Sequence, residues 1–238
     1  GVDYATAVPS FERLDSILRA RAPSASESSL YYSYFDYAEL LLVGTENQKA
    51  LKCIDRFIET SPDYYEMEKV YNARGVALFR IDQYEKAADS FKKAMAANPD
   101  YMAPRVNLRG VFLRVNAVEQ AMLSHRLGNY EAALKQVDNL LIIATSYLPA
   151  LRLKGDILRD MGRDGEALDY YQSIVAENPE DPITYGVRLE MARILERQGE
   201  LKGALEVLGA NASRFSKVPN DPTRAEIIRI MDLLQKKP

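Results

Sequence analysis

The chain has one histidine, His125, and one cysteine, Cys53, and these are the first residues to consider for acid–base or nucleophilic chemistry. A histidine base needs an orienting partner and a nearby nucleophile. Ser124 and Arg126, on either side of His125, form no recognised motif with it. Cys53 lies in the apolar and charged stretch 51–55, where a packed or half-exposed thiol is the simpler interpretation. Neither residue predicts a catalytic centre.

The sequence also lacks the patterns that hold metals and cofactors. One cysteine excludes an intramolecular disulfide, and one cysteine with one histidine is too few for a structural zinc site. No glycine-rich phosphate-binding loop and no nucleophile elbow is present. The tripeptide Asn211-Ala212-Ser213 matches a glycosylation acceptor, a pattern that arises often by chance. We expect no enzyme activity, no metal site and no cofactor.

Composition and charge exclude further classes of protein. Over 238 residues, 31 lysines and arginines against 34 acidic residues give a net charge of −3, which argues against a general nucleic-acid binder. The chain is 47% apolar and 27% charged, as is typical of globular proteins. No uncharged run is long enough for a membrane-spanning helix, so we expect no direct membrane insertion. The sequence begins at Gly1, so a signal peptide or anchor could precede it, and a cytoplasmic and a periplasmic location both stay open.

The elements that position these residues follow from the spacing of small, aromatic and proline residues. Two stretches carry similar residue types 12, 16, 19 and 24 positions after a glycine. The first is Gly75 with Ala87, Phe91, Ala94 and Pro99, and the second is Gly155 with Ala167, Tyr171, Ile174 and Pro179. A glycine or alanine allows two helices to approach closely, an aromatic ring fills the space between them, and a proline ends the second helix. The spacing predicts repeated helix pairs.

This pattern resembles the tetratricopeptide repeat (TPR), a 34-residue helix–turn–helix unit with the signature W-x2-L-G-x2-Y…A-x3-F…P. In residues 68–101 the residues that carry the resemblance are Tyr71, Gly75, Leu78, Tyr84, Ala87, Phe91, Ala94 and Pro99. Tyrosine replaces the tryptophan, and Arg74 replaces the leucine. The resemblance implies an all-α, right-handed α-solenoid of about five such units. The predicted units are 31–64, 68–101, 102–147, 148–181 and 185–218, within a repeat domain spanning 31–218.

Both ends of the chain predict capping elements. Ser10 can begin a helix that runs to about Arg21, followed by a polar loop, so residues 1–30 form an N-terminal segment. Residues 219–238 predict a C-terminal capping helix, with Asp221 as N-cap and Pro222 at its first position. Such terminal helices cover the open edges of a solenoid.

The third unit contains 12 extra residues, at 102–113. The simpler interpretation is one long first helix from Pro104 to about Leu127, extended by about 18 Å. The alternative is an additional short helix with a turn near Asn116. An apolar stripe on this helix either packs against the preceding pair, near Phe91 and Met95, or forms an interface. The stripe consists of Leu108, Val111, Phe112 and Val115.

In the TPR family the first helix of each pair lines a concave groove, and the resemblance carries that geometry to specific positions here. The expected groove residues are Tyr32, Phe35, Glu39, Asn72, Val76, Phe79, Arg80, Met122, Arg126, Arg152, Asp156, Arg159, Arg193 and Arg197. The tyrosines could instead be core residues with wet hydroxyl groups. The charged half could also neutralise itself, within Asp156–Arg159–Asp160 and Arg193–Glu196–Arg197.

The resemblance implies a non-catalytic module that binds a peptide or helix of a partner protein in the concave groove. Some family members hold the carboxylate tail of chaperones with lysines, asparagines and an arginine. Only Asn72 matches that set here, while Val76, Val115 and Glu119 depart from it, so we do not expect this activity. The alternative is a structural assembly subunit or homodimer that uses the long helix near 104–127. A large apolar patch outside the groove would favour that alternative.

Overall fold

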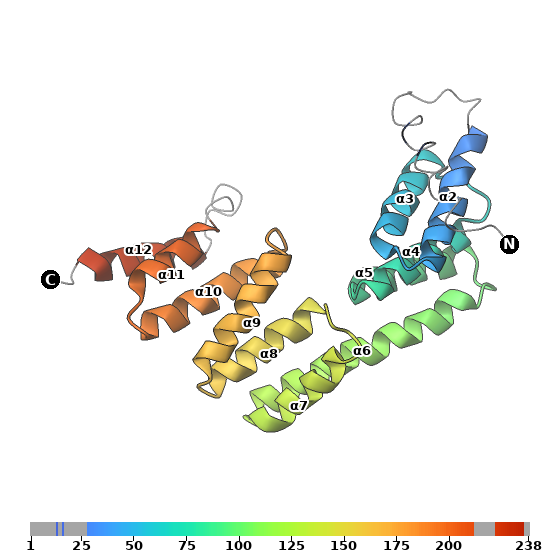
Figure 1. Cartoon of the computed structure of the whole chain (residues 1–238). Helices are drawn as coiled ribbons and strands as arrows, with labels where there is room; N and C mark the ends of the chain where they lie inside the picture. Colours follow the sequence, from blue (N-terminus) through green and yellow to red (C-terminus); the bar gives the residue numbers. More distant parts are fainter. Residues whose placement is uncertain (1–12, 14–15, 17–27, 212–221, 236–238) are drawn as a thin grey trace. The chain divides into compact units, whose positions relative to one another are not determined.

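The computed structural model describes residues 13, 16, 28–211 and 222–235, and within them it has eleven helices and no strand (Figure 1). This confirms the expected all-α class. The helices are α2 (Ser28–Val43), α3 (Asn47–Thr60), α4 (Met67–Arg80), α5 (Tyr84–Ala97), α6 (Ala103–Arg126), α7 (Tyr130–Leu141), α8 (Leu148–Asp160), α9 (Asp164–Glu177), α10 (Pro182–Arg197), α11 (Leu201–Gly209) and α12 (Pro222–Gln235). The N-terminal helix expected from Ser10 to Arg21 and the N-cap Asp221 lie outside the described residues.

The helices belong to two compact units. Unit 1 comprises residues 1–116 and unit 2 comprises residues 117–238, so the boundary falls within α6. In unit 1, α2 packs on α3 and α4 packs on α5. In unit 2, α8 packs on α9, α10 on α11, and α11 on α12. Consecutive helices therefore form antiparallel pairs, as a helix–turn–helix repeat requires.

The close approach of paired helices depends on two glycines. A Cβ added at Gly75 would lie 2.4 Å from the Phe91 ring, and one added at Gly155 would lie 2.4 Å from the Tyr171 ring. Both rings are fully buried. The aromatic ring of each second helix thus occupies the space that a side chain on the first helix would need.

The turn between the helices of a pair is the same five times. The second residue after each first helix has a positive φ; these residues are Thr45, Asp82, Gly128, Gly162 and Gly199. In the turn after α8, Gly162 N–H donates to the Arg159 carbonyl and Arg163 N–H donates to the Leu158 carbonyl, each over 2.9 Å. The other four turns repeat both bonds. These are Schellman motifs, which satisfy the last carbonyl groups of a helix.

Arg74, which departs from the repeat signature, joins three helices of unit 1. Its Nε donates to Asp55 Oδ1 on α3 over 2.6 Å, and its Nη1 donates to the buried Ser90 hydroxyl on α5 over 2.8 Å. An arginine at this position therefore replaces an apolar contact with polar bonds to both neighbouring helices.

Helix α6 is a single helix of 24 residues, without a break at Asn116. Its apolar residues do not share one environment, because Leu108 and Val111 are buried whereas Phe112 is 49% exposed. Val115 is half-buried. The four residues expected to form one stripe are therefore divided between the interior and the surface.

The last helix, α12, begins at Pro222, as expected from the sequence. Ile230 enters an apolar cluster with Ala204 and Leu208 of α11. Behind it, the buried Arg188 guanidinium donates to Asn211 Oδ1 over 3.1 Å, and Asn211 Nδ2 donates to the Thr223 hydroxyl over 3.3 Å. A buried polar network thus attaches α12 to the last helix pair.

Candidate functional site

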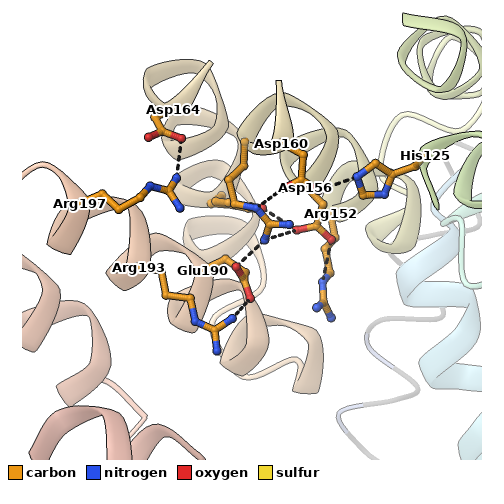
Figure 2. Close-up of polar contacts among 10 residues, drawn as sticks. His125, Arg152, Asp156, Asp160, Asp164, Glu190, Arg193 and Arg197 are labelled. Carbon is orange, nitrogen blue, oxygen red and sulfur yellow. Dashed lines mark hydrogen bonds and ion pairs between the residues drawn. The ribbon is translucent and has the colours of Figure 1, made fainter. Parts of the chain in front are cut away.

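Charged side chains of α8 and α10, with Asp164 of α9, form a row in unit 2 (Figure 2). We call this set the charged row; it comprises Arg152, Asp156, Arg159, Asp160, Asp164, Glu190, Arg193 and Arg197. Sequence position within the repeats places most of these residues on first helices, which are the helices expected to line the groove.

Arg159 is the centre of the charged row. Its Nε donates to Asp160 Oδ1 over 2.8 Å, and its Nη1 donates to Glu190 on the next first helix. His125 Nε2, from the last turn of α6, lies 2.8 Å from Asp160 Oδ2. Side chains from α6, α8 and α10 are therefore linked through one guanidinium and its neighbours.

The outer arginines of the row are also paired. Arg193 Nη1 donates to Glu190 Oε1 over 2.6 Å, and Arg197 Nη2 donates to Asp164 Oδ1 over 2.8 Å. Glu196 pairs with Arg229 of α12 and not with Arg193 or Arg197. The self-neutralising group Arg193–Glu196–Arg197 expected from the sequence therefore does not form, and longer-range partners replace it.

Two carboxyl groups of the row have opposite pKa shifts. Burial raises the pKa of Asp156, against the effects of a 2.5 Å hydrogen bond from the Tyr171 hydroxyl and of the nearby Arg152 and Arg159 guanidiniums. Burial also acts to raise the pKa of Asp160, but hydrogen bonds from Arg159 and His125 outweigh it and lower that pKa. In each case, the direction of the pKa shift depends on whether desolvation or the interactions that favour the ionised carboxylate have the larger effect.

The charged row carries no net charge when its histidine neighbour is neutral, because four guanidiniums face four carboxylates. Each of those eight groups has a partner of opposite charge within the row. A ligand charge would have to compete with these pairs. The row is therefore suited to holding α8 and α10 together more than to attracting a charged ligand.

An apolar pocket lies in unit 1, between first helices α4 and α6. It has a volume of about 320 Å³. The residues that line it are Val76, Phe79, Arg80, Phe91, Val106, Asn107 and Gly110. Gly110 leaves room on the α6 side, since a Cβ there would lie 3.6 Å from the Phe79 ring, an ordinary contact distance.

Arg114 covers one side of the pocket wall. Its guanidinium carbon lies 4.4 Å from the centre of the Phe79 ring and 5.6 Å from that of Tyr84. Its Nη1 donates to the Gly110 carbonyl over 3.1 Å. Arg114 therefore contacts two residues that line the pocket, Phe79 through a cation–π contact and Gly110 through a hydrogen bond.

An amide network continues from the pocket along α4 and α6. Asn107 Nδ2 donates to Asn72 Oδ1 over 3.0 Å, and Asn72 Nδ2 lies 3.4 Å from the Tyr101 hydroxyl. Asn72 thus uses its amide to join the two helices.

Apart from Tyr32 and Asn72, whose amide is described above, the expected groove residues of unit 1 divide into three groups. Val76, Phe79 and Arg80 line the pocket. Glu39 as a whole residue is exposed. The pKa of its carboxyl is nevertheless raised, and partial burial is the largest of the causes. Phe35 is only 5% exposed and packs against Phe57, with ring centres 5.7 Å apart, so its placement in the groove is wrong. The side chain of Tyr32 lies outside the described residues.

The expected groove residues of unit 2 lie in or near the charged row. Met122 and Arg126 are exposed on α6. Arg152, Asp156, Arg159, Arg193 and Arg197 belong to the row itself.

Some residues of both sites were missed from the sequence. Val106, Asn107 and Gly110 lie in the 12-residue extension, which has no counterpart in a regular repeat, so repeat position could not place them. The one signal in the sequence that could have drawn attention to this region is Gly110, a helix breaker within the run from Pro104 to about Leu127. Asp164 was missed because it comes from a second helix.

The residues first considered for chemistry, His125 and Cys53, contact neighbouring side chains of the fold. The His125 ring is tilted by 52° relative to that of Tyr130, with ring centres 5.7 Å apart, and His125 pairs with Asp160. Cys53 is half-buried beside the core of unit 1. Asn211 is fully buried, so its side-chain amide is not accessible for glycosylation. The described part of the chain contains no group of three or more potential metal ligands. None of its helices combines the length and apolar character needed to cross a bilayer.

Comparison with known proteins gives the family. Tetratricopeptide repeat families match residues 68–101 and 118–182. No curated protein sequence matches the chain. The TPR domain of P58(IPK) has a similar structure, with a TM-score of 0.62 and 14% identity over 99% of this chain and 63% of that one. The present chain therefore spans less than two thirds of that domain.

Two further solved structures are similar at lower scores. One is the Rap conjugation gene regulator of plasmid pLS20 in complex with the Phr* peptide, with 12% identity, 91% and 63% coverage and a TM-score of 0.46. The other is the TPR2AB-domain:pHSP90 complex of yeast Sti1, with 14% identity, 92% and 88% coverage and a TM-score of 0.41.

These matches agree with the helix pairs described above. The first family match coincides with the predicted unit 68–101, and the second covers α7, α8 and α9 completely. Stacked repeats of this kind generally serve as protein-interaction modules. With five identical turns, two glycine–aromatic pairs and an all-helical fold, the chain is a tetratricopeptide repeat protein of the α-solenoid class.

Proposed function

We propose that this chain is a non-catalytic module that binds a segment of a partner protein along its first helices, with an apolar side chain of the partner in the pocket of unit 1. The observation that carries the proposal is the cavity of about 320 Å³ lined by Val76, Phe79 and Arg80 of α4 and by Val106 and Gly110 of α6. Its size is at the lower end of the range for small-ligand pockets.

The apolar pocket is a better binding site than the charged row for a physical reason. Filling a pocket with an apolar side chain removes apolar surface from water and stabilises a complex by about 1.5–3 kcal/mol. In the charged row, a ligand would first have to replace ion pairs that are already formed.

Substitution of Gly110 tests the proposal. Short random peptides displayed on phage are selected on the full chain, and we expect the selected peptides to share one large apolar residue. The Gly110→Leu variant fills the pocket from its α6 side without a backbone clash, because the nearest atoms to a Cβ there are 3.6 Å away. Affinity for the selected peptides should fall about tenfold or more.

Gly165→Leu is the matched control, because a Cβ at Gly165 of α9 meets nothing within 4 Å. Its affinity should equal that of the parent chain. Equal affinities for the parent and Gly110→Leu would show that the pocket is not the binding site.

A second candidate function is self-association through α6. The observation in its favour is the exposure of neighbouring apolar residues, since Phe112 is 49% and Leu113 is 65% exposed. Sedimentation of the parent and of a Phe112→Ser, Leu113→Ser variant at several concentrations tests this function. A dimer that the variant loses would support it, and a parent chain that is monomeric at all concentrations would exclude it.

A further inference from the structure

We infer that the segment bound in the apolar pocket is acidic on either side of its apolar anchor, with carboxylates placed against Arg80 and Arg114. This inference rests on the proposed function and specifies its ligand. It depends on which charged groups around the pocket have partners of opposite charge within the chain and which do not.

The part of α6 that belongs to unit 1 is basic. Between Ala103 and Asn116 it carries three arginines and no aspartate or glutamate. These are Arg105, Arg109 and Arg114. Arg80 of α4 adds a fourth guanidinium at the pocket itself. Among the described residues, no carboxylate lies within ion-pair distance of any of the four.

The arginines of the charged row in unit 2 differ from those around the pocket. All four arginines of that row have carboxylate partners. The four arginines of the charged row are therefore paired with carboxylates, whereas the four arginines at and beside the pocket are not.

The two arginines at the pocket are held in place without losing their charge. Arg80 Nη1 donates to the Leu42 carbonyl over 2.6 Å, at the C-terminal end of α2, while the residue itself is exposed. Arg114 stacks on Phe79 and donates to the Gly110 carbonyl. Both bonds fix a guanidinium with neutral acceptors, so its positive charge is available to a ligand.

Two acidic groups of unit 1, Asp82 and Glu39, have partners of their own. Asp82 accepts a hydrogen bond from the Tyr84 hydroxyl over 2.6 Å. Glu39 of α2 interacts with Lys69 and Glu66, at the opposite end of α4 from Arg80. Neither forms an ion pair with Arg80 or Arg114, although the Tyr84 hydroxyl interacts with both Asp82 and Arg114. The complement that the pocket lacks is a carboxylate beside an apolar group.

Three synthetic peptides test the inference. Each has one central leucine, flanked on both sides by glutamates, glutamines or lysines, and each is labelled for fluorescence anisotropy with the full chain. We expect the glutamate peptide to bind about tenfold or more tightly than the glutamine peptide, and the lysine peptide to bind most weakly. The advantage of glutamate should shrink as salt is added, because salt screens exposed charges.

The variant Arg80→Gln should weaken binding of the glutamate peptide more than binding of the glutamine peptide, so the advantage of glutamate should shrink. Arg126→Gln is the matched control, because Arg126 is an exposed first-helix arginine in unit 2. Arg114→Gln provides a second variant at the pocket. Loss of the glutamate preference in Arg80→Gln but not in Arg126→Gln would support the inference.

The possible failures are distinct. If the three peptides bind equally and Gly110→Leu weakens them all, the pocket binds apolar anchors and the acidic preference is refuted. If none of the leucine peptides binds, and selected peptides ignore Gly110→Leu, the proposed function itself fails.

Discussion

The ring of Phe91 occupies the position that a side chain at residue 75 would need. A Cβ on Gly75 would lie 2.4 Å from Phe91 Cε1, and the equivalent distance from residue 155 to Tyr171 is also 2.4 Å. The two pairs stand at the same offset in repeats 80 residues apart. In both of these helix pairs, a glycine on the first helix leaves room for an aromatic ring of the second helix.

Gly75→Ala and Gly155→Ala should each destabilise the protein. The added methyl group forces a buried ring out of a packed position, at a cost of about 1–3 kcal/mol or more. Denaturant titration followed by circular dichroism measures the change. Gly165→Ala is the control; it should be neutral or slightly stabilising, because its Cβ meets open space. Unchanged stability in both test variants would mean that the helices of a pair are not this close.

Thr45→Gly should stabilise the protein. Thr45 is a β-branched residue with φ of 63°, a conformation that costs an L-residue about 1–2 kcal/mol. Glycine adopts it freely, and this gain exceeds its entropic cost of about 0.5–1 kcal/mol. Thermal melting should show a small rise in Tm. Thr145→Gly, at an exposed turn residue without positive φ, should lower Tm instead.

Acid should weaken the attachment of α12. Hydrogen bonds from Arg229 lower the pKa of Glu196 below its ordinary value of 4.5. A carboxyl whose pKa is lower in the folded state contributes stability above its unfolded pKa and loses it as pH falls through the folded value. Glu196→Gln should therefore melt below the parent at pH 7, by an amount that corresponds to about 1 kcal/mol or less.

The pH dependence of the Glu196→Gln variant tests the direction of the Glu196 pKa shift. The difference in melting temperature between Glu196→Gln and the parent should disappear as pH falls through the lowered folded-state pKa of Glu196, where the carboxyl becomes protonated. A difference that persists unchanged at low pH would contradict the assignment of this ion pair. Glu206→Gln, an exposed carboxylate of α11, is the control for a general charge effect.

Asn211→Ala should cost about 1–3 kcal/mol, because it leaves the buried Arg188 guanidinium and the Thr223 hydroxyl without their amide partner. Denaturant titration measures the loss. Asn139→Ala, at an exposed position of α7, should change stability by much less. Equal small effects of both substitutions would show that the network does not hold α12.

Leu108→Ser and Phe112→Ser should have different effects, although the two residues are one helical turn apart. Leu108 is buried, so its replacement should cost a few kcal/mol of unfolding free energy. Phe112 is 49% exposed, so its replacement should leave unfolding nearly unchanged. Chemical denaturation of each single variant separates the two. A large loss of stability in Phe112→Ser would place that ring in the core.

Local spacing was enough to predict much of this fold. The glycine–aromatic offsets identified the helix pairs around Gly75 and Gly155, and the run from Pro104 without a strong breaker identified a long helix. Pro222 marked the start of α12. Each of these signals acts within a few turns of helix, where sequence and geometry are tied directly.

Contacts between distant helices could not be predicted in the same way. Glu196 has arginines three residues before it and one after it, yet it pairs with Arg229, which is 33 positions away. Phe35 was assigned to the groove by repeat position, but two aromatic neighbours, Phe57 and Tyr64, draw it into the core. The pocket depends on the distance between α4 and α6 at Gly110, which no sequence pattern contains.

The five Schellman turns have a consequence for how this chain can change in length. The left-handed residues of successive turns are separated by as few as 34 positions, from Gly128 to Gly162, and by as many as 46, from Asp82 to Gly128. The hydrogen bonds of the turns are nevertheless the same. The same turn geometry therefore forms whatever the length of the helix before it. Residues inserted near the start of a first helix lengthen that helix and create new surface, such as the pocket wall at Gly110. The pairing of the two helices stays intact.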